Sequence, residues 1–271
     1  MKITVTHSRL SQFSTPLSVE NYCVFAFQGV GLFAVDAVEF AYAGNTLLFL
    51  SPYQHFQWKG GSDATVSLLQ FHGDFYCIEY HKKEVACNGL LFNAIFLTPH
   101  IEASEATFAE IEHILQRIEA ESNTHEAYSE AVLKSYLQLI LALSSKEKSM
   151  QLTEAPKEVS HQLVADFQGL LNTHFVRERG VQYYAEALHL QTDTFSKRIK
   201  SLTGKSPTKL IQERVVLEAK KLLHLTHKSI KEVAFELNFE DEFYFSRFFK
   251  KTVGLSPKHF RERVGISIVA V

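Results

Sequence analysis

Two stretches fifty residues apart decide how the rear of this sequence folds: "FSKRIKSLTGKSPTKL" (195–210) and "FSRFFKKTVGLSPKHF" (245–260). Each begins with Phe-Ser and a basic residue, and each then has a lysine, a glycine and a Ser-Pro pair at the same positions. Upstream, "AEALHL" (185–190) and "AFELNF" (234–239) also match, with one extra residue in the second turn. The sequence therefore uses one structural unit twice.

The glycine and the Ser-Pro pair mark where helices end and begin in each unit. Glycine suits the left-handed position after a helix, and proline suits the first turn of the next helix. Each unit thus reads as a short helix with a small residue, Ala185 or Ala234, then a turn, a second helix and the start of a third. Two helices joined by a tight turn predict a helix-turn-helix, whose second helix can enter a DNA major groove.

The second helices are amphipathic in the same way. The expected buried residues are Phe195, Ile199 and Leu202 in the first unit, and Phe245, Phe249 and Val253 in the second. The expected outward residues are Asp193, Ser196, Lys197 and Lys200 in the first unit, and Phe243, Ser246, Arg247 and Lys250 in the second. A solvated helix face would explain either set alone. The same polar and basic outward face occurs twice, each time with matching Gly and Ser-Pro signals at the helix end, which favours a pair of recognition helices.

The segment "SIKEVAFELNFEDEFYFSRFFKKTVGLSPKHFRE" (229–262) resembles the second helix-turn-helix of the AraC/XylS family of bacterial transcription regulators. The resemblance covers roughly 159–263. The first unit departs from the family pattern at Ile199, where Phe is usual, and at Asp193, which places a carboxylate on the groove face. The resemblance implies two recognition helices joined by a long helix over 207–225 and lying in successive major grooves.

Roles at the DNA follow from side-chain chemistry. Arg247 is the first candidate for base contact, because its guanidinium can bond guanine O6 and N7 together. The further candidates for base contact are Ser196, Lys197, Asp193, Glu242 and Phe243. The expected phosphate partners, which position the protein without reading sequence, are Lys200, Lys205, Lys250, Lys251 and Lys258.

Charge divides the chain as these motifs do. Residues 1–155 carry 9 Lys and Arg against 17 Asp and Glu, a net −8, whereas residues 156–271 carry 19 against 13, a net +6. A basic rear and an acidic front indicate that only the rear meets a polyanion such as double-stranded DNA.

The front reads as short β segments followed by helices. The β segments "YCVFAFQG", "GLFAVDAVEFAYAG", "TLLFLSP" and "ATVSLLQF" lie within 22–71 and are separated by Gly and Pro. The fold class expected is α+β with several domains: a β-barrel or jelly roll, then helices, then an all-α double helix-turn-helix domain. The expected domains are a sensor over 1–103, linker and dimerisation helices over 104–145, an interdomain linker over 146–158 and the DNA-binding domain over 159–265.

The segment "GNTLLFLSPYQHF" (44–56) resembles the cupin-like barrel that members of the family often carry, which implies a small-molecule effector and a homodimer. Activation is the expected mode, with repression left open. Cupin enzymes hold a metal with a His-x-His pair, which this chain lacks, so we expect no enzyme and no cofactor. The candidate effector contacts are His55, Trp58, His72, Glu79, His81 and Glu84, although His55 could equally be a core or rim residue and the aromatic residues could serve the core alone.

Two alternatives for the front stay open. It could mediate protein contacts only, or it could be a metal or redox sensor using Cys77, Glu79, His81 and Cys87. These four lack the Cys-x-x-Cys pairing that marks zinc sites, so no metal is assigned. The chain has three cysteines, no signal-like start in "MKITVTHSRL" and no long apolar run, which predicts a cytoplasmic protein with reduced thiols and no membrane partner.

Overall fold

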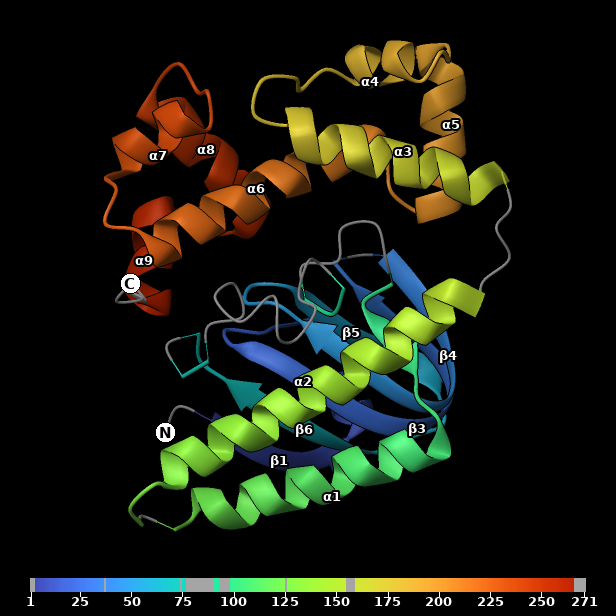
Figure 1. The fold of residues 1–271 in the computed structure, drawn as a ribbon, viewed down its shortest axis with the longest axis vertical. Coiled ribbons are helices and arrows are strands. Elements are labelled where there is room, and N and C mark those ends of the chain that lie inside the picture. Colours follow the sequence, from blue (N-terminus) through green and yellow to red (C-terminus); the bar gives the residue numbers. More distant parts are fainter. Residues whose placement is uncertain are drawn as a thin grey trace. The chain divides into compact units, whose positions relative to one another are not determined.

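The computed structural model describes residues 3–36, 38–73, 75–76, 90–92, 98–124, 126–154 and 159–265. The chain divides into two compact units, a front unit that ends at Glu154 and a rear unit that follows it. Figure 1 shows strands and two long helices in the front unit and only helices in the rear unit. The expected fold class, an antiparallel β unit with helices followed by an all-α unit, is confirmed.

The described strands of the front unit form one antiparallel sheet. The strands are β1 (Ile3–Arg9), β2 (Leu17–Ser18), β3 (Tyr22–Val35), β4 (Val38–Leu50), β5 (His55–Gly61), β6 (Thr65–Phe71) and β7 (His100–Glu102), with a short 3-10 helix η1 (Leu10–Phe13) after β1. The sheet order is β1-β6-β3-β4-β7, and β5 pairs with both β2 and β3. The long strand β3 pairs with β6 through its first half and with β5 through its second half, so it belongs to both parts of the sheet.

Alternate residues of β3 enter different hydrophobic clusters, which explains why almost every residue in its first half is apolar. Cys23, Phe25 and Phe27 lie in the cluster enclosed by the folded sheet, together with the rings of Phe33 and Phe56. The neighbouring residues of β3 face the other cluster, which the sheet forms with the helices. Because both faces of the strand are buried, the period of two is hidden in the sequence.

Two helices cover the outer face of the sheet, α1 (Glu105–Ser122) and α2 (Ser129–Glu154). Figure 1 shows them side by side across the strands, and both contribute apolar residues to the shared cluster. Ser104 caps α1, because its hydroxyl accepts from the Thr107 backbone N–H.

Three glycines of the front unit do not separate short strands as the sequence predicted, whereas Gly60 and Gly61 do end a strand. Gly29 and Gly31 lie inside β3, and Gly44 lies inside β4. At Gly31 an added Cβ would come 2.3 Å from the Gly60 carbonyl oxygen, so this glycine permits a close backbone approach between β3 and β5. Strands β1, β2, β5 and β7 were not predicted. Strands β2 and β7 have only two and three residues, and β5 contains no β-branched residue, whereas β1 was missed although four of its seven residues are β-branched.

The predicted interdomain linker at 146–158 is wrong over its first part, because α2 continues to Glu154. Residues 146–154 contain no Gly or Pro, and their Lys, Glu, Gln, Met and Leu residues favour helix. Residues 155–158 lie outside the described residues.

A lysine is buried where α2 meets the segment before β7. The Lys148 side chain is 3% exposed, and its Nζ donates to the Thr98 carbonyl oxygen at 2.5 Å. Burial lowers the pKa of Lys148 to about 8 from its ordinary 10.5. Nearby, burial and the charge of Lys148 lower the pKa of His100 to about 4. At neutral pH the front unit therefore holds a desolvated ammonium at a cost in stability.

We expect Lys148→Met to raise the stability of the front unit at pH 7 and to abolish part of its pH dependence. Between pH 8 and 10.5 the unfolded chain binds more protons at this lysine than the folded chain, so wild-type stability rises with pH in that range. The variant lacks this contribution, which is on the order of 3 kcal/mol. Urea unfolding at several pH values measures it, and parallel pH profiles for the two proteins would refute the role given to Lys148.

The rear unit consists of helices packed around one long central helix. The described helices are α3 (Val159–His174), α4 (Val181–Ala187), α5 (Thr192–Thr203), α6 (Pro207–Leu225), α7 (Ile230–Glu236), α8 (Glu242–Val253) and α9 (Pro257–Val264). Helices α3, α4 and α5 pack on one another. Helix α8 contacts both α7 and α9, and all three of these helices contact α6. Within the described parts of the chain, no helix is both long enough and apolar enough to span a membrane.

Candidate nucleic-acid interface

The two predicted helix-turn-helix units are present, as α4 with α5 and as α7 with α8, and their turns have the same geometry. His189 and Asn238 occupy matching positions with positive φ angles of 55° and 56°. The next residue in each turn, Leu190 or Phe239, donates its backbone N–H to the carbonyl of Ala185 or Ala234 at 2.9 Å. Both alanines are fully buried, so a larger side chain would separate the two helices of its unit.

The ends of α5 and α8 also match as predicted. Gly204 and Gly254 have left-handed φ angles of 72° and 87°, and their N–H groups bond the carbonyls of Lys200 and Lys250. The hydroxyl of Ser206 caps α6, and the hydroxyl of Ser256 caps α9. The Gly and Ser-Pro signals thus set the exit of each second helix.

The buried faces agree with the prediction at every position except one. Phe195, Ile199, Phe245 and Phe249 are fully buried and Val253 is buried, but Leu202 is 39% exposed. The residue of the first unit that matches Val253 is Thr203, whose hydroxyl donates to the Ile199 carbonyl. Leu202 was assigned to the core because it is apolar, although its position matches the polar Thr252.

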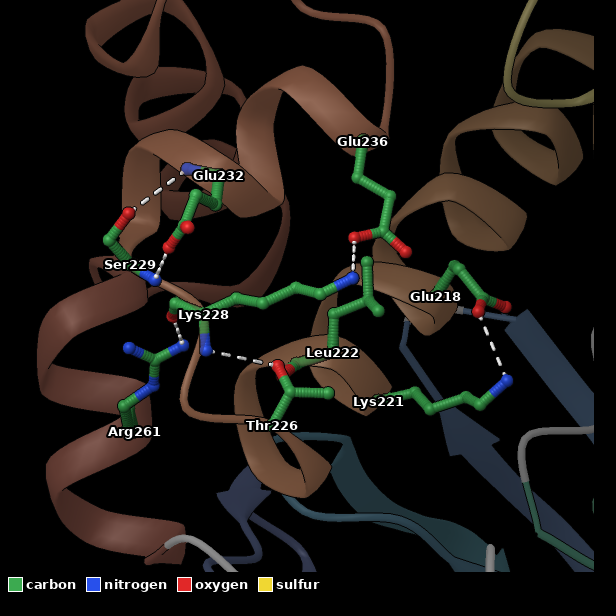
Figure 2. A network of polar contacts seen from close by, with 9 residues as sticks. All are labelled: Glu218, Lys221, Leu222, Thr226, Lys228, Ser229, Glu232, Glu236 and Arg261. Atoms are coloured by element: carbon green, nitrogen blue, oxygen red, sulfur yellow. Dashed lines mark hydrogen bonds and ion pairs between the residues drawn. The ribbon is translucent and has the colours of Figure 1, made fainter.

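A polar network fixes the start of α7 against α6 and α9 (Figure 2). Ser229 and Glu232 form a capping box, in which each side chain bonds the other residue's backbone N–H. The hydrogen bond from the Ser229 backbone N–H, and after it the interaction with the Ser229 side chain, lower the pKa of the Glu232 carboxyl. Arg261 of α9 donates to the carbonyls of Leu223 at 3.0 Å and Lys228 at 2.6 Å, and so joins α9 to the end of α6 and the entry of α7. The entry angle of the second helix-turn-helix is therefore held from three helices.

Helix α6 sets the distance between the two units. It has 19 residues, which at about 1.5 Å per residue gives roughly 28 Å. Successive major grooves on one face of DNA recur at about 34 Å. The helix therefore has the length needed to separate two recognition helices by nearly one turn of DNA.

The candidate base-contact residues lie on the outer faces of α5 and α8. Asp193 and Lys197 on α5 are exposed and Ser196 is half-buried; on α8, Phe243 and Arg247 are exposed and Glu242 and Ser246 are half-buried. The apolar ring of Phe243 is 71% exposed. A large ring left in water at the start of α8 suits apolar contact with a thymine methyl.

Four of the five expected phosphate partners are exposed, and one is engaged within the protein. Lys200, Lys250, Lys251 and Lys258 lie on the surface. The Nζ of Lys205 is 2.8 Å from a carboxylate oxygen of Glu213, and both side chains are 18% exposed. Lys205 therefore anchors the start of α6, a role that its sequence position did not reveal.

Two further exposed residues share the faces of these helices and were not predicted. Arg198 is exposed on α5, and Tyr244 is 52% exposed on α8. Tyr244 directly follows Phe243 and its ring lies 5.8 Å from the ring of Phe239 in the preceding turn. The adjacent pair of exposed aromatic residues in "EFYF" (242–245) was the available signal.

The expected effector contacts are not brought together among the described residues. His55 is exposed at the start of β5. Its Nδ1 is 3.5 Å from Oδ1 of Asp36, which lies at the turn between β3 and β4. Trp58 packs against the enclosed cluster, and its Nε1 donates to the Tyr42 hydroxyl at 3.3 Å. His72 follows β6. Glu79, His81, Glu84, Cys77 and Cys87 lie outside the described residues.

A polar hollow lies elsewhere in the front unit, beside β7. It has a volume of about 360 Å³ and is lined by Thr98, His100, Ile101, Glu102 and Gln151. None of the expected effector contacts is among these residues. Sequence reasoning missed them because the hollow joins β7 to the part of α2 that was expected to be linker.

Cys23 is buried in the enclosed cluster, where burial raises the pKa of its thiol to about 12. A thiol in that state is a poor nucleophile and a poor metal ligand. Among the described residues, no group of three or more His, Cys, Asp or Glu side chains could hold a metal ion.

Comparison with known proteins finds similarity for the rear unit and for longer parts of the chain. Residues 184–263 match the family model described as "Helix-turn-helix domain". The chain is 25% identical over 166 residues to the HTH-type transcriptional activator RhaS of Klebsiella pneumoniae, covering 60% of this chain and 57% of that protein. It is 25% identical over 207 residues to the HTH-type transcriptional activator RhaR of Enterobacter sp., covering 74% and 72%. The match thus spans just over half the length of RhaS.

Among solved structures, apo ToxT K231A from Vibrio cholerae aligns over 98% of both chains with a TM-score of 0.45 and 14% identity. The helix-turn-helix match and the two relatives confirm the family resemblance drawn from the repeated Gly and Ser-Pro signals. The names of these relatives are those of transcription regulators, in agreement with the expectation that the chain is not an enzyme.

Proposed function

We propose that this chain, whose rear unit carries a helix-turn-helix domain of the AraC/XylS family, is a sequence-specific DNA-binding transcription regulator that acts in the cytoplasm. One observation supports this most strongly: the two helix-turn-helix units share the geometry of their turns and of their Gly and Ser-Pro exits, and they are joined by one helix of nearly one DNA turn. The relatives RhaS and RhaR are named transcriptional activators, so activation is the proposed mode.

In the proposed complex, α5 and α8 enter successive major grooves of double-stranded DNA. Arg247 contacts a guanine, and Ser196, Lys197, Asp193, Glu242 and Phe243 are the other proposed base contacts. The exposed lysines Lys200, Lys250, Lys251 and Lys258 contact phosphates and fix the register. The −8 charge of the front half disfavours a second DNA surface there.

The salt dependence of binding tests whether the rear unit contacts DNA through these lysines. Each phosphate contact contributes roughly −0.9 to the slope of log affinity against log salt. With four exposed lysines in place, we expect a slope of about −4 for a duplex of arbitrary sequence. Fluorescence anisotropy of a labelled duplex measures it, and an affinity that does not change with salt would contradict the proposal.

For the front unit we propose a small-molecule effector, supported by the hollow beside β7. His100, Glu102 and Gln151 give its lining hydrogen-bonding groups, and pockets of this size accommodate small ligands. The competing role is that the front unit only contacts other proteins. It is favoured by the aromatic side chains that fill the cluster enclosed by the sheet, because these rings serve the core and not a ligand. A thermal-shift screen of the full chain against polar metabolites distinguishes the two, since only the effector role predicts a ligand whose shift is reduced by Gln151→Ala.

We also propose a homodimer formed through α2. Val132, Leu139 and Met150 are 36%, 42% and 51% exposed. At spacings of seven and eleven residues they lie on one face of the helix. This face points away from the buried Leu137 and Ile140. An apolar stripe of this kind is typical of a helix that packs against a second helix.

Leu139→Glu should convert the dimer to a monomer at micromolar concentration, because a carboxylate would be buried in the apolar seam. Leu152→Glu is the matched control, since Leu152 is 46% exposed but lies on a different side of α2. Sedimentation equilibrium of the three proteins measures the effect. A wild-type monomer, or a Leu139→Glu dimer, would remove α2 as the interface.

A further inference from the structure

The two helix-turn-helix units are joined by a side chain as well as by α6. Arg179 lies in the segment between α3 and α4, directly before the first helix-turn-helix unit. Its guanidinium donates to the carbonyl of Leu237 and lies over the ring of Phe239 at 3.9 Å from the ring centre. Both partners belong to the turn between α7 and α8, so this contact crosses 58 residues from one unit to the other.

The segment that carries Arg179 is itself held in place. Phe175 is buried and its ring lies 3.9 Å beneath the guanidinium of Arg214 on α6. The carbonyl of Glu178 accepts a 2.7 Å hydrogen bond from the hydroxyl of Tyr184, a residue of α4 with no exposed surface. The backbone that leads into Arg179 is therefore attached to α6 through Phe175 and to α4 through Glu178.

The residues that Arg179 contacts orient the second recognition helix. Phe239 is 3% exposed, and its ring packs against Phe245 of α8 at a centroid distance of 5.1 Å. Leu237 ends α7, and its carbonyl is one of those that the helix itself leaves without a partner. A shift of the Arg179 side chain would thus be transmitted directly to the turn that positions α8.

The repeat itself shows that this contact is not a general feature of the unit. The position equivalent to Arg179, immediately before the cap of α7, is Lys228, which pairs with Glu236 inside its own unit. The position equivalent to Phe239 is Leu190, which has no aromatic face. The cross-unit contact therefore depends on residues that differ between the two copies.

Stability alone is a poor explanation for this arginine. Burial lowers the pKa of Arg179, and its Nε is buried with no hydrogen-bond partner among the described residues. An apolar side chain could cover the Phe239 ring without that desolvation. A planar guanidinium, by contrast, fixes both direction and distance through its stacked face and its hydrogen bond.

We infer that Arg179 is a positioning residue that fixes the rotation and spacing of α8 relative to α5, and so determines which half-site separation the protein accepts. With α6 alone, the two units could pivot at the ends of one helix. A second attachment closes a ring of contacts through α6, the Arg179 segment and the α7–α8 turn. This inference rests on the proposed function, because it concerns how the two recognition helices meet DNA together.

The test uses the full chain and duplexes recovered from random sequence by the wild-type protein. Each duplex is compared with versions carrying one or two extra base pairs between the half-sites, and with each half-site alone. We expect wild type to lose at least tenfold in affinity when two base pairs are inserted, since these rotate one half-site by about 70°. Arg179→Ala should lose only about threefold on the same insertion, while its affinity for either half-site stays within twofold.

Two further variants separate positioning from phosphate contact and from misfolding. Phe239→Leu, which copies the first unit and changes no charge, should relax the spacing preference as Arg179→Ala does. Arg177→Ala removes a charge from an exposed residue of the same segment and should leave the preference intact. The melting temperature of each variant shows whether it is folded.

Each outcome has a definite meaning. If Arg179→Ala weakens half-site binding and reduces the salt slope by about one, Arg179 contacts a phosphate and the inference is wrong. If both Arg179→Ala and Phe239→Leu keep the wild-type spacing preference, the inference is also wrong and the proposed function stands. If wild type recovers no sequence from the random pool, the proposed function itself fails.

Discussion

Arg247→Ala is expected to remove the preference of the protein for its cognate site while leaving weak, salt-sensitive binding to any duplex. Arg247 is exposed near the middle of α8, where its side chain can reach a major groove. A bidentate contact with guanine contributes about 1–3 kcal/mol of discrimination. Cognate affinity should therefore fall roughly 10- to 100-fold.

Lys251→Ala is the control for this prediction. Lys251 is an exposed residue of the same helix and is proposed to contact phosphate, so its loss should weaken binding to all sequences alike. Gel-shift titrations with cognate and scrambled duplexes measure both effects. The role of Arg247 is excluded if its substitution lowers the two affinities by the same factor.

Phe249→Ala should destabilise the rear unit by about 3–5 kcal/mol, as expected for truncating a buried Phe. Phe249 has no exposed surface, and its ring packs against Phe245 at 5.9 Å and Phe260 at 5.5 Å. These rings join α8 to α9, so the second helix-turn-helix should lose its fixed shape. Because the free energy of unfolding of a folded protein is only about 5–15 kcal/mol, the expected loss is a large fraction of the total stability.

Phe243→Ala is the matched control, because Phe243 lies in the same helix and is 71% exposed. Its removal should change the free energy of unfolding by less than about 0.5 kcal/mol and act on DNA affinity instead. Urea unfolding of both variants makes the comparison. A loss below about 1 kcal/mol for Phe249→Ala would mean that the cavity collapses and that α8 does not depend on this ring.

The rear unit could be predicted from sequence in detail because its signals are local. Gly204, Gly254 and the two Ser-Pro pairs act within one helix turn of their own positions, and the buried stripes follow the period of the helix. Leu202 and Lys205 were misjudged because residue type was weighed above register and ion pairing. For Leu202 the second copy of the unit held the correcting information, because the matching residue there is the polar Thr252.

The front unit was harder to predict because its determinants are distant in sequence. Gly31 lies inside a strand since it must approach Gly60, twenty-nine residues later, and a local reading sees only a strand breaker. Helix α2 continues through a polar stretch because its residues favour helix, although their pattern is not periodic. The contact of Arg179 with Leu237 likewise has no periodic signature, because it joins residues 58 positions apart that only the folded chain brings together.

The central claim is that one chain presents two recognition helices to successive grooves. Selection of bound duplexes from a random pool by the full chain tests it most directly. The account predicts a motif of two half-sites whose centres lie about 10–11 base pairs apart, with a guanine in one half that is no longer selected by Arg247→Ala. An unselected pool, or a single half-site with no preferred neighbour one turn away, would contradict it.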